Sequence, residues 1–180
     1  MRSARSVALV DEVRALVGAR ILDFSRVHVV LATGELWLEE SLVVSAEERA
    51  AGWWQFETDG YEPFVRRMAG RDDYAILGEY SDRKRDSLKA VENPWTPFLV
   101  DHILAVWHET VGAADESLLA LVFCAPDGIA ASILFDNDDV LLVSSEKVWR
   151  YMTTVLSHPS TVGARVEVLR EGQTSSQAGP

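Results

Sequence analysis

Three apolar segments separated by short polar turns constrain the fold of this chain most strongly. The segments cover residues 118–124, 129–135 and 140–144, and the turns between them are residues 126–128 (Pro-Asp-Gly) and 136–138 (Asp-Asn-Asp). Pro, Asp, Asn and Gly favour tight reversals of the chain. Strand-length apolar runs joined in this way predict two consecutive β-hairpins, and therefore an antiparallel sheet.

The N-terminal part of the chain is predicted to form a helix followed by strands. Apolar residues at helical spacing predict a helix over residues 6–17, with Ser6 as its N-cap and Gly18 at its C-terminal end. Alternating apolar and polar residues follow, as expected for a sheet with one face in water. The expected strands are residues 21–24, 27–31 and 36–44, with a turn at residues 33–34.

The strongest helical signal lies over residues 97–111. Thr96 is a favourable N-cap, Pro97 would occupy the first helical position, and Gly112 follows the last apolar residue. These start and stop residues match the known preferences of helix ends. We therefore expect a long amphipathic helix directly before the two hairpins.

Shorter elements are predicted from weaker signals. Ser45 and Glu48 form a capping-box pattern, in which each side chain binds a backbone N–H group at the start of a helix, so a short helix is expected up to Gly52. The other expected elements are helices over residues 62–69, 82–92 and 146–155, the last capped by Ser145, and strands over residues 74–77 and 164–169.

These elements predict an α+β fold with mainly antiparallel sheet and packed helices. Residues 1–170 are expected to form one domain, because a chain of 180 residues fits the usual domain size of roughly 100–200 residues. Residues 171–180 are small and polar, and we expect them to form a disordered tail.

An internal similarity leaves a second description of the domain open. The segment LVVSAE at residues 42–47 resembles LLVSSE at residues 141–146. Both are apolar runs that lead into a helix-capping pattern. The chain could therefore consist of two similar helix-plus-three-strand modules, at residues 6–52 and 96–156.

Cysteine content and hydropathy indicate the compartment in which the chain works. Cys124 is the only cysteine, so no intramolecular disulfide can form, which fits a reducing compartment. The N-terminus shows no apolar signal-peptide core, and no apolar run approaches the roughly 20 residues of a membrane-spanning helix. We expect a cytoplasmic protein that does not bind a membrane.

Negative charge is concentrated in the second half of the chain. The net charge is −11, and no Lys or Arg occurs between Lys89 and Lys147. Residues 91–150 hold ten acids and two bases, which gives this segment a net charge of −8. Such a surface repels the phosphates of nucleic acids and attracts cationic proteins. Direct nucleic-acid binding is therefore not expected.

Common catalytic, metal and cofactor motifs are absent from the sequence. There is no Gly-x-Ser-x-Gly, no Walker pattern and no Gly-x-Gly-x-x-Gly. Residues 136–139 resemble the start of a calcium loop, but Leu141 and Lys147 stand where such a loop needs Gly and Glu. On the expected helix, His102 and Glu109 would lie about 10.5 Å apart along the axis, too far for one metal ion. No metal, cofactor or catalytic residue is predicted.

Two functional hypotheses from different classes follow. The first is a non-enzymatic module that binds a basic protein, such as an inhibitor or immunity-type protein that neutralises a cationic toxin. Acidic surfaces accelerate binding to such partners by electrostatic steering. The predicted contact residues are Glu109, Asp115, Glu116, Asp136, Asp138 and Asp139.

The second hypothesis is a small-molecule-binding protein or enzyme with an aromatic pocket. Ligand pockets are commonly lined by apolar and aromatic side chains. The walls of this pocket would be Trp53, Trp54, Phe56 and Tyr61. His28 or His102 would serve as a proton-transfer group. A homo-oligomeric scaffold without a ligand is a third alternative that the sequence leaves open.

Overall fold

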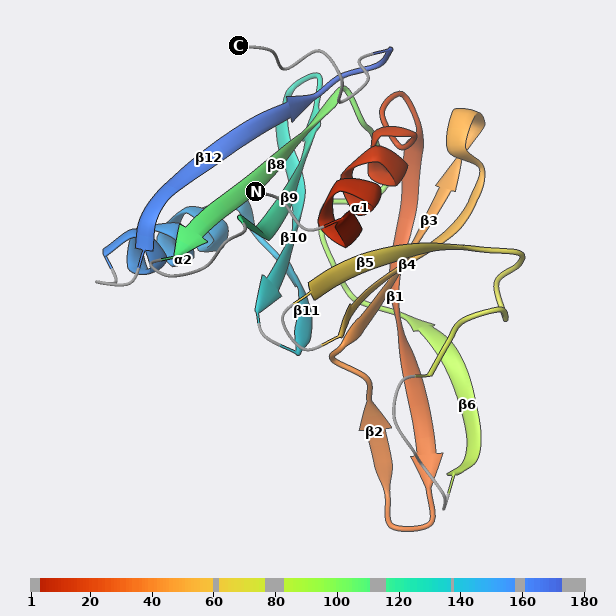
Figure 1. Cartoon of the computed structure of the whole chain (residues 1–180). Coiled ribbons are helices and arrows are strands. Elements are labelled where there is room, and N and C mark those ends of the chain that lie inside the picture. The colour runs from red at the N-terminus through yellow and green to blue at the C-terminus, as the bar shows by residue number, and fades with distance from the viewer. Residues whose placement is uncertain are drawn as a thin grey trace.

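Two antiparallel β-sheets and two α-helices make up the part of the protein that the structure describes (Figure 1). The structure is a computed structural model, and it describes residues 4–59, 62–76, 83–110, 116–136, 138–157 and 161–172. One sheet has seven strands and the other has five, and the two pack around a shared core. The prediction of an α+β fold with mainly antiparallel sheet is confirmed.

The seven-stranded sheet is centred on the long strand β1 (Arg20–Leu31). Strands β2 (Glu35–Trp37) and β3 (Ser41–Glu47) pair with one edge of β1, and β6 (Arg83–Ala90) and β7 (Phe98–Leu99) pair with the other. Figure 1 shows β2 and β6 on either side of the C-terminal half of β1. Strands β4 (Gly52–Asp59) and β5 (Glu62–Met68) continue the sheet beyond β3. The two strands expected over residues 21–31 are therefore one continuous strand.

The five-stranded sheet has the order β11-β10-β9-β8-β12. Its strands are β8 (His102–Thr110), β9 (Ser117–Ala125), β10 (Gly128–Asp136), β11 (Asp139–Val143) and β12 (Thr161–Leu169). Short turns join β9, β10 and β11, so the two predicted hairpins are confirmed. Gly128, the first residue of β10, has a φ of 141°, which residues other than glycine rarely adopt. Helix α2 (Ser145–Ser157) connects the edge strand β11 to β12 at the opposite edge, and confirms the helix expected there.

The main hydrophobic core lies between the sheets and includes helix α1 (Ala4–Arg14), the first predicted helix. Its largest contributions are Leu9 and Val13 of α1, Phe24 and Trp54 of the seven-stranded sheet, and Trp107 and Phe123 of the five-stranded sheet. Each of these side chains is at most 1% exposed. A second cluster lies on the other face of the five-stranded sheet, where α2 covers it with Val148 and Met152.

The strongest helical prediction, residues 97–111, is wrong. Strands β7 and β8 occupy most of this segment, and residues 111 and 112 lie outside the described part of the chain. Ile103 and Trp107 of β8 face the core between the sheets, whereas Leu104 and Val106 face the cluster beneath α2. Because both faces of β8 are covered, its sequence is a nearly continuous apolar run. Periodicity alone cannot distinguish such a run from a buried helix.

Several shorter predictions are also corrected. The helices expected over residues 62–69 and 82–92 are strands β5 and β6, which pair with β4 and β1. In β6 only Leu88 is buried, so backbone pairing with β1 fixes a strand that has no apolar pattern of its own. The capping-box residue Ser45 lies within β3, and only a 3₁₀ turn at Glu48–Ala50 follows it. The described residues 74–76 form no strand, and residue 77 lies outside the described part.

The two stretches that the sequence left open as possible similar modules differ in the order of their elements. Residues 6–52 begin with α1 and continue with strands, whereas residues 96–156 begin with strands and end with α2. Of the expected tail, Glu171 and Gly172 form a turn, and residues 173–180 lie outside the described residues. No helix in the described part of the chain is long and apolar enough to cross a membrane.

Candidate functional site

Acidic residues from several strands and turns gather at one end of the five-stranded sheet. His108 of β8 lies opposite Ser117 of β9, and Asp136 of β10 lies opposite Asp139 of β11. The end of β8, the start of β9 and the β10–β11 turn therefore share one end of the sheet, because all these strands are antiparallel neighbours. The residues of this acidic end are Glu109, Glu116, Asp136, Asp138 and Asp139. Asp115, the sixth predicted contact residue, lies outside the described residues.

The loop between β2 and β3 adds two acids to the acidic end, Glu39 and Glu40. The Val140 N–H of β11 donates a hydrogen bond of 2.8 Å to the Glu39 carbonyl, and the Thr58 N–H of β4 donates one of 3.3 Å to the Glu40 carbonyl. These bonds place the loop directly beside β11. The acid pair is visible in the sequence, but only the packing of the two sheets brings it beside the β10–β11 turn.

A buried arginine holds this region together. Arg26 is 8% exposed, and its guanidinium donates hydrogen bonds of 3.3, 3.0, 2.9 and 2.5 Å to the carbonyl oxygens of Leu38, Glu39, Ser41 and Val140. Burial lowers the pKa of Arg26, and the negative charges of Glu39, Asp139 and Glu40 oppose that shift. An arginine side chain stays protonated in proteins. Arg26 is therefore a buried cation that joins β1, the β2–β3 loop and β11.

Two of the predicted contact residues are already bonded within the chain. Glu116 accepts hydrogen bonds of 3.2 and 2.7 Å from Nε and Nη2 of Arg165. Asp136 accepts a hydrogen bond of 2.8 Å from the Tyr151 hydroxyl of α2. Burial and this bond to Asp136 raise the pKa of Tyr151 to about 12, so the phenol stays protonated at neutral pH. Glu109, Asp138 and Asp139 are exposed and form the accessible part of the acidic end.

A small cavity of about 100 Å³ opens beside Asp136. Its lining comprises Thr58, His108, Ser117, Leu118, Leu119, Phe135, Asp136 and Tyr151. Thr58 is 4% exposed, and neither its Oγ1 nor the buried Nδ1 of His108 has a hydrogen-bond partner among the described residues. Burial lowers the pKa of His108 and so favours the neutral form of its imidazole. Neither Thr58 nor His108 was predicted as a site residue, because nothing in the sequence brings β4 to β8.

A second polar feature lies buried on the other face of β4. Glu57 is 1% exposed, and its Oε1 accepts a hydrogen bond of 3.0 Å from Nε2 of Gln55. Gln55 in turn accepts a bond of 2.8 Å from Nη2 of Arg66. Burial raises the pKa of Glu57 to about 7; Arg66 opposes this shift and Glu40 reinforces it. The sequence contains no signal for this carboxyl group, since Arg66 comes from β5 and Glu40 from the β2–β3 loop.

The aromatic segment of the second hypothesis does not line one pocket. Trp54 and Phe56, at most 1% exposed, are part of the core between the sheets. Trp53 packs on the opposite face of β4, because successive side chains of a strand point to opposite faces. Tyr61 lies outside the described residues.

The two histidines proposed for proton transfer are bonded elsewhere. His28 is 2% exposed, and its Nε2 lies 2.9 Å from a carboxylate oxygen of Glu35. His102 Nδ1 lies 2.7 Å from a carboxylate oxygen of Asp101. Neither histidine borders the cavity beside Asp136. The two residues lie on different sheets, so the structure does not bring them together.

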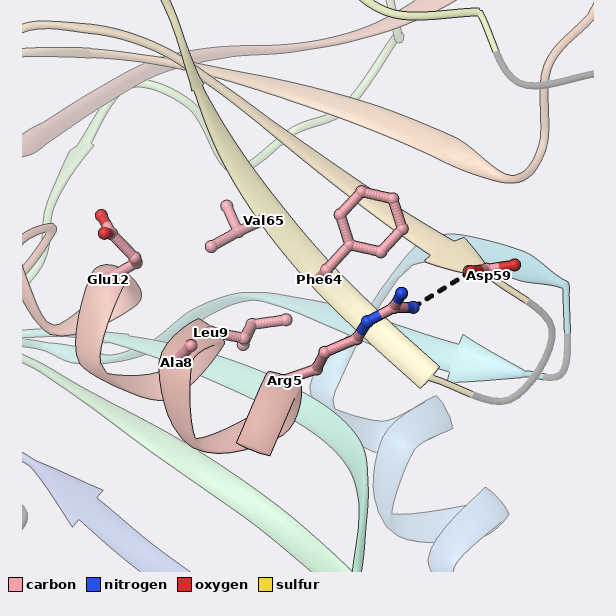
Figure 2. A pocket seen from close by; sticks show the side chains of 7 residues that line it. All are labelled: Arg5, Ala8, Leu9, Glu12, Asp59, Phe64 and Val65. Carbon is pink, nitrogen blue, oxygen red and sulfur yellow. Dashed lines mark hydrogen bonds and ion pairs between the residues drawn. The ribbon is translucent and has the colours of Figure 1, made fainter. Parts of the chain in front are cut away.

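A larger groove of about 400 Å³ runs between α1 and β5 (Figure 2). Arg5, Ala8, Leu9 and Glu12 line it from α1, Phe64 and Val65 from β5, and Asp59 from the end of β4. Figure 2 shows Arg5 reaching from α1 to Asp59, and the Nη1–Oδ2 distance is 3.0 Å. The groove therefore combines an apolar floor with charged groups at its rim.

Neither metal chemistry nor a known relative identifies the site. No group of three or more His, Cys, Asp or Glu residues in the described ranges is placed to hold a metal ion. No protein-family model matches the chain, and comparisons with curated proteins and with solved structures gave no significant match.

Proposed function

We propose that this chain is a non-enzymatic binding module of the cytoplasm that engages a basic protein through its acidic end. An inhibitor or immunity-type protein that neutralises a cationic toxin would have this character. The observation that carries the proposal is the convergence of acids from separate strands and loops on one end of the five-stranded sheet. The exposed members are Glu39, Glu109, Asp138 and Asp139.

The composition of the acidic end favours a protein partner over a nucleic acid. The buried cation of this region, Arg26, donates to four backbone carbonyls, and its Nη2 also lies 3.5 Å from Oε2 of Glu39. The exposed carboxylates of Glu109, Asp138 and Asp139 therefore dominate the outer surface. Carboxylates repel phosphates and attract Lys and Arg side chains. Such surfaces accelerate association by electrostatic steering and discriminate against partners of the wrong charge.

The proposal predicts a charge-dependent loss of binding. Replacing Glu109 with Gln and Asp138 and Asp139 with Asn should weaken partner binding by about 10- to 100-fold, because three interfacial charges each contribute roughly 0.5–1 kcal/mol. Most of the loss should appear in the association rate, and the salt dependence should flatten. The partner is identified by mass spectrometry after capture from a lysate of the source organism. Kinetics are then measured with the purified partner at several salt concentrations.

A matched control variant separates the effect of the acidic end on binding from the effect of net charge. Asp72→Asn, Glu92→Gln and Asp127→Asn change the net charge by the same amount, and all three residues are exposed away from the acidic end. This control variant should bind like the original chain. Equal weakening by both triple variants, or capture of a partner without a basic surface, would remove the acidic end from the mechanism.

Small-molecule binding is the second candidate function, and the groove between α1 and β5 favours it. Its volume of about 400 Å³ lies within the range of roughly 300–1,000 Å³ that is typical of ligand pockets. Glu62, which also approaches Arg5 at 3.7 Å, adds to the two acids that line the groove. Three acids against one base favour a ligand with an apolar body and an amino group.

This second candidate predicts ligand-dependent stabilisation that disappears when the groove is filled. A ligand present at a hundred times its Kd should stabilise the fold by about 2.7 kcal/mol. Ala8→Phe places a ring in the groove and should abolish that response, whereas Ala4→Phe at the exposed start of α1 should not. Thermal unfolding across a panel of amines measures the effect. A flat response to every amine would argue against a ligand in the groove.

A further inference from the structure

The cavity beside Asp136 offers an acceptor-rich recess at the centre of the acidic end. Three of its lining residues come from elements far apart in the sequence: Thr58 from β4, His108 from β8 and Tyr151 from α2. Thr58 is nine-tenths buried, yet its hydroxyl has no partner among the described residues. A buried polar atom without a hydrogen bond costs free energy, so such atoms are normally satisfied by water or by a ligand.

We propose that this cavity receives the positively charged end of a lysine or arginine side chain from the basic partner. The inference deepens the proposed function and rests on it. It assigns to the acidic end one buried anchoring position in addition to the exposed charges. Anchors of this kind, seated in a pocket and surrounded by weaker contacts, carry most of the binding energy of protein interfaces.

The chemistry of the lining suits a cation. Asp136 supplies a carboxylate whose orientation is held by the 2.8 Å bond from the Tyr151 hydroxyl. Thr58 Oγ1 can accept a hydrogen bond, and so can His108 Nδ1 when the proton of the neutral imidazole is on Nε2. An ammonium or guanidinium group has several N–H donors and no acceptor. Its several donors match these three acceptors.

The carboxylates around the cavity also favour a cation. Glu39 and Glu40 lie on the loop that hydrogen-bonds to β11 and β4. Asp138 lies in the turn that follows Asp136, and Asp139 begins β11. These carboxylates lower the energy of a cation at the mouth of the cavity and raise that of an anion. A phosphate or carboxylate ligand would meet Asp136 directly.

The size of the cavity limits what can enter. A volume of about 100 Å³ corresponds to roughly three water molecules at about 30 Å³ each. The last three heavy atoms of a lysine side chain, or the guanidinium group of arginine, occupy a comparable space. This volume lies below the roughly 300–1,000 Å³ that is typical of small-molecule pockets, so the cavity suits the tip of a side chain that is presented by a larger partner.

Small side-chain analogues test this proposal without the partner. The isotope-labelled full chain is titrated with the Nα-acetyl methylamides of lysine, arginine and the neutral norleucine. The ring signals of His108 are followed by NMR. We expect a saturable shift with at least one cationic analogue and none with norleucine. Comparing the lysine and arginine analogues shows which side chain the cavity prefers.

Substitutions at the lining residues complete the test. Thr58→Val should raise the Kd of the cationic analogue by about fivefold, Thr58→Ser should preserve it, and Asp136→Asn should raise it by about tenfold or more. Thr153→Val on the exposed face of α2 is the matched control and should change nothing. Urea unfolding of each variant verifies that the fold is retained.

Three outcomes would overturn the proposal: no response to either cationic analogue, an equal response to norleucine, or unchanged affinity in Thr58→Val and Asp136→Asn. Each would identify a cavity that holds water only. Because the analogues need no partner, such a failure is distinct from a failure of the proposed function. The proposed function stands if the triple variant at Glu109, Asp138 and Asp139 binds a basic partner more weakly than the original chain does.

Discussion

Replacing Arg26 with methionine is expected to lower the free energy of unfolding by about 3–5 kcal/mol, the usual cost of breaking a buried charged network. Methionine fills part of the space but donates no hydrogen bond. The carbonyl oxygens of Leu38, Glu39, Ser41 and Val140 would lose their shared donor in a region that water reaches poorly. Val140 belongs to β11, so the substitution should also loosen the junction between the two sheets.

Urea unfolding and backbone hydrogen exchange measure this effect. Arg26→Lys should recover part of the stability, because one ammonium group cannot reach four carbonyls spread over the plane of a guanidinium. Arg20→Met is the control, because Arg20 is exposed and its Nε forms a surface ion pair of 3.6 Å with Oε1 of Glu47. This substitution should lower the free energy of unfolding by less than about 1 kcal/mol. A cost below 1 kcal/mol for Arg26→Met, with unchanged exchange in β11, would refute the role of Arg26 as the link between the sheets.

Replacing Glu57 with glutamine is expected to stabilise the protein at alkaline pH by up to about 3 kcal/mol and to change little near pH 4.5. The pKa of Glu57 is raised from 4.5 to about 7, so the folded protein holds its proton more tightly than the unfolded chain does. Stability therefore falls as the pH rises from 4.5 to 7, and the full penalty remains above pH 7. A pKa of 4.5 in the unfolded chain and about 7 in the folded protein corresponds to about 3 kcal/mol of the free energy of unfolding. Glutamine keeps an oxygen that accepts the bond from Gln55 and never ionises.

The measurement is the urea midpoint of both proteins at about pH 5, 7 and 8.5. Plotted against pH, the urea midpoints of the two proteins should separate progressively between about pH 5 and about pH 7 and then stay a constant distance apart. Glu92→Gln, at an exposed position, is the control for the loss of one negative charge and should follow the original chain within about 0.5 kcal/mol. Curves for Glu57→Gln and the original chain that stay parallel from pH 5 to pH 8.5 would show that Glu57 is not buried as a neutral group.

The two hairpins and both α-helices were predicted correctly from the sequence. The turns at residues 126–128 and 136–138 define the hairpins of β9, β10 and β11, because Gly, Pro, Asp and Asn favour reversals whatever surrounds them. Helix α1 was recognised from its apolar spacing, and α2 from the serines before it. The Ser144 Oγ accepts a hydrogen bond of 3.4 Å from the Lys147 N–H, one position before the predicted cap.

The candidate site, like the fold, was predicted only in part from the sequence. The sequence determined that negative charge is concentrated in residues 91–150 and that Asp138 lies in the turn before β11. It could not show that Glu116 is paired with Arg165, or that Asp136 is held by Tyr151. Those contacts join residues 49 and 15 positions apart, and no local pattern encodes them.

Tertiary structure alone decided which elements meet at the acidic end. Residues 102–110 form strand β8 because neighbours on both faces and both edges outweigh the helical capping signals at residues 96–97. A strand that is covered on both faces shows no alternation of apolar and polar residues. The same packing brings Glu39 and Thr58 of one sheet to Asp136 of the other. The sequence determined the acidic character of the chain and its hairpins, because charge and turn preference belong to single residues. The cavity and its buried polar atoms depend on how two sheets pack, which is a property of the whole chain.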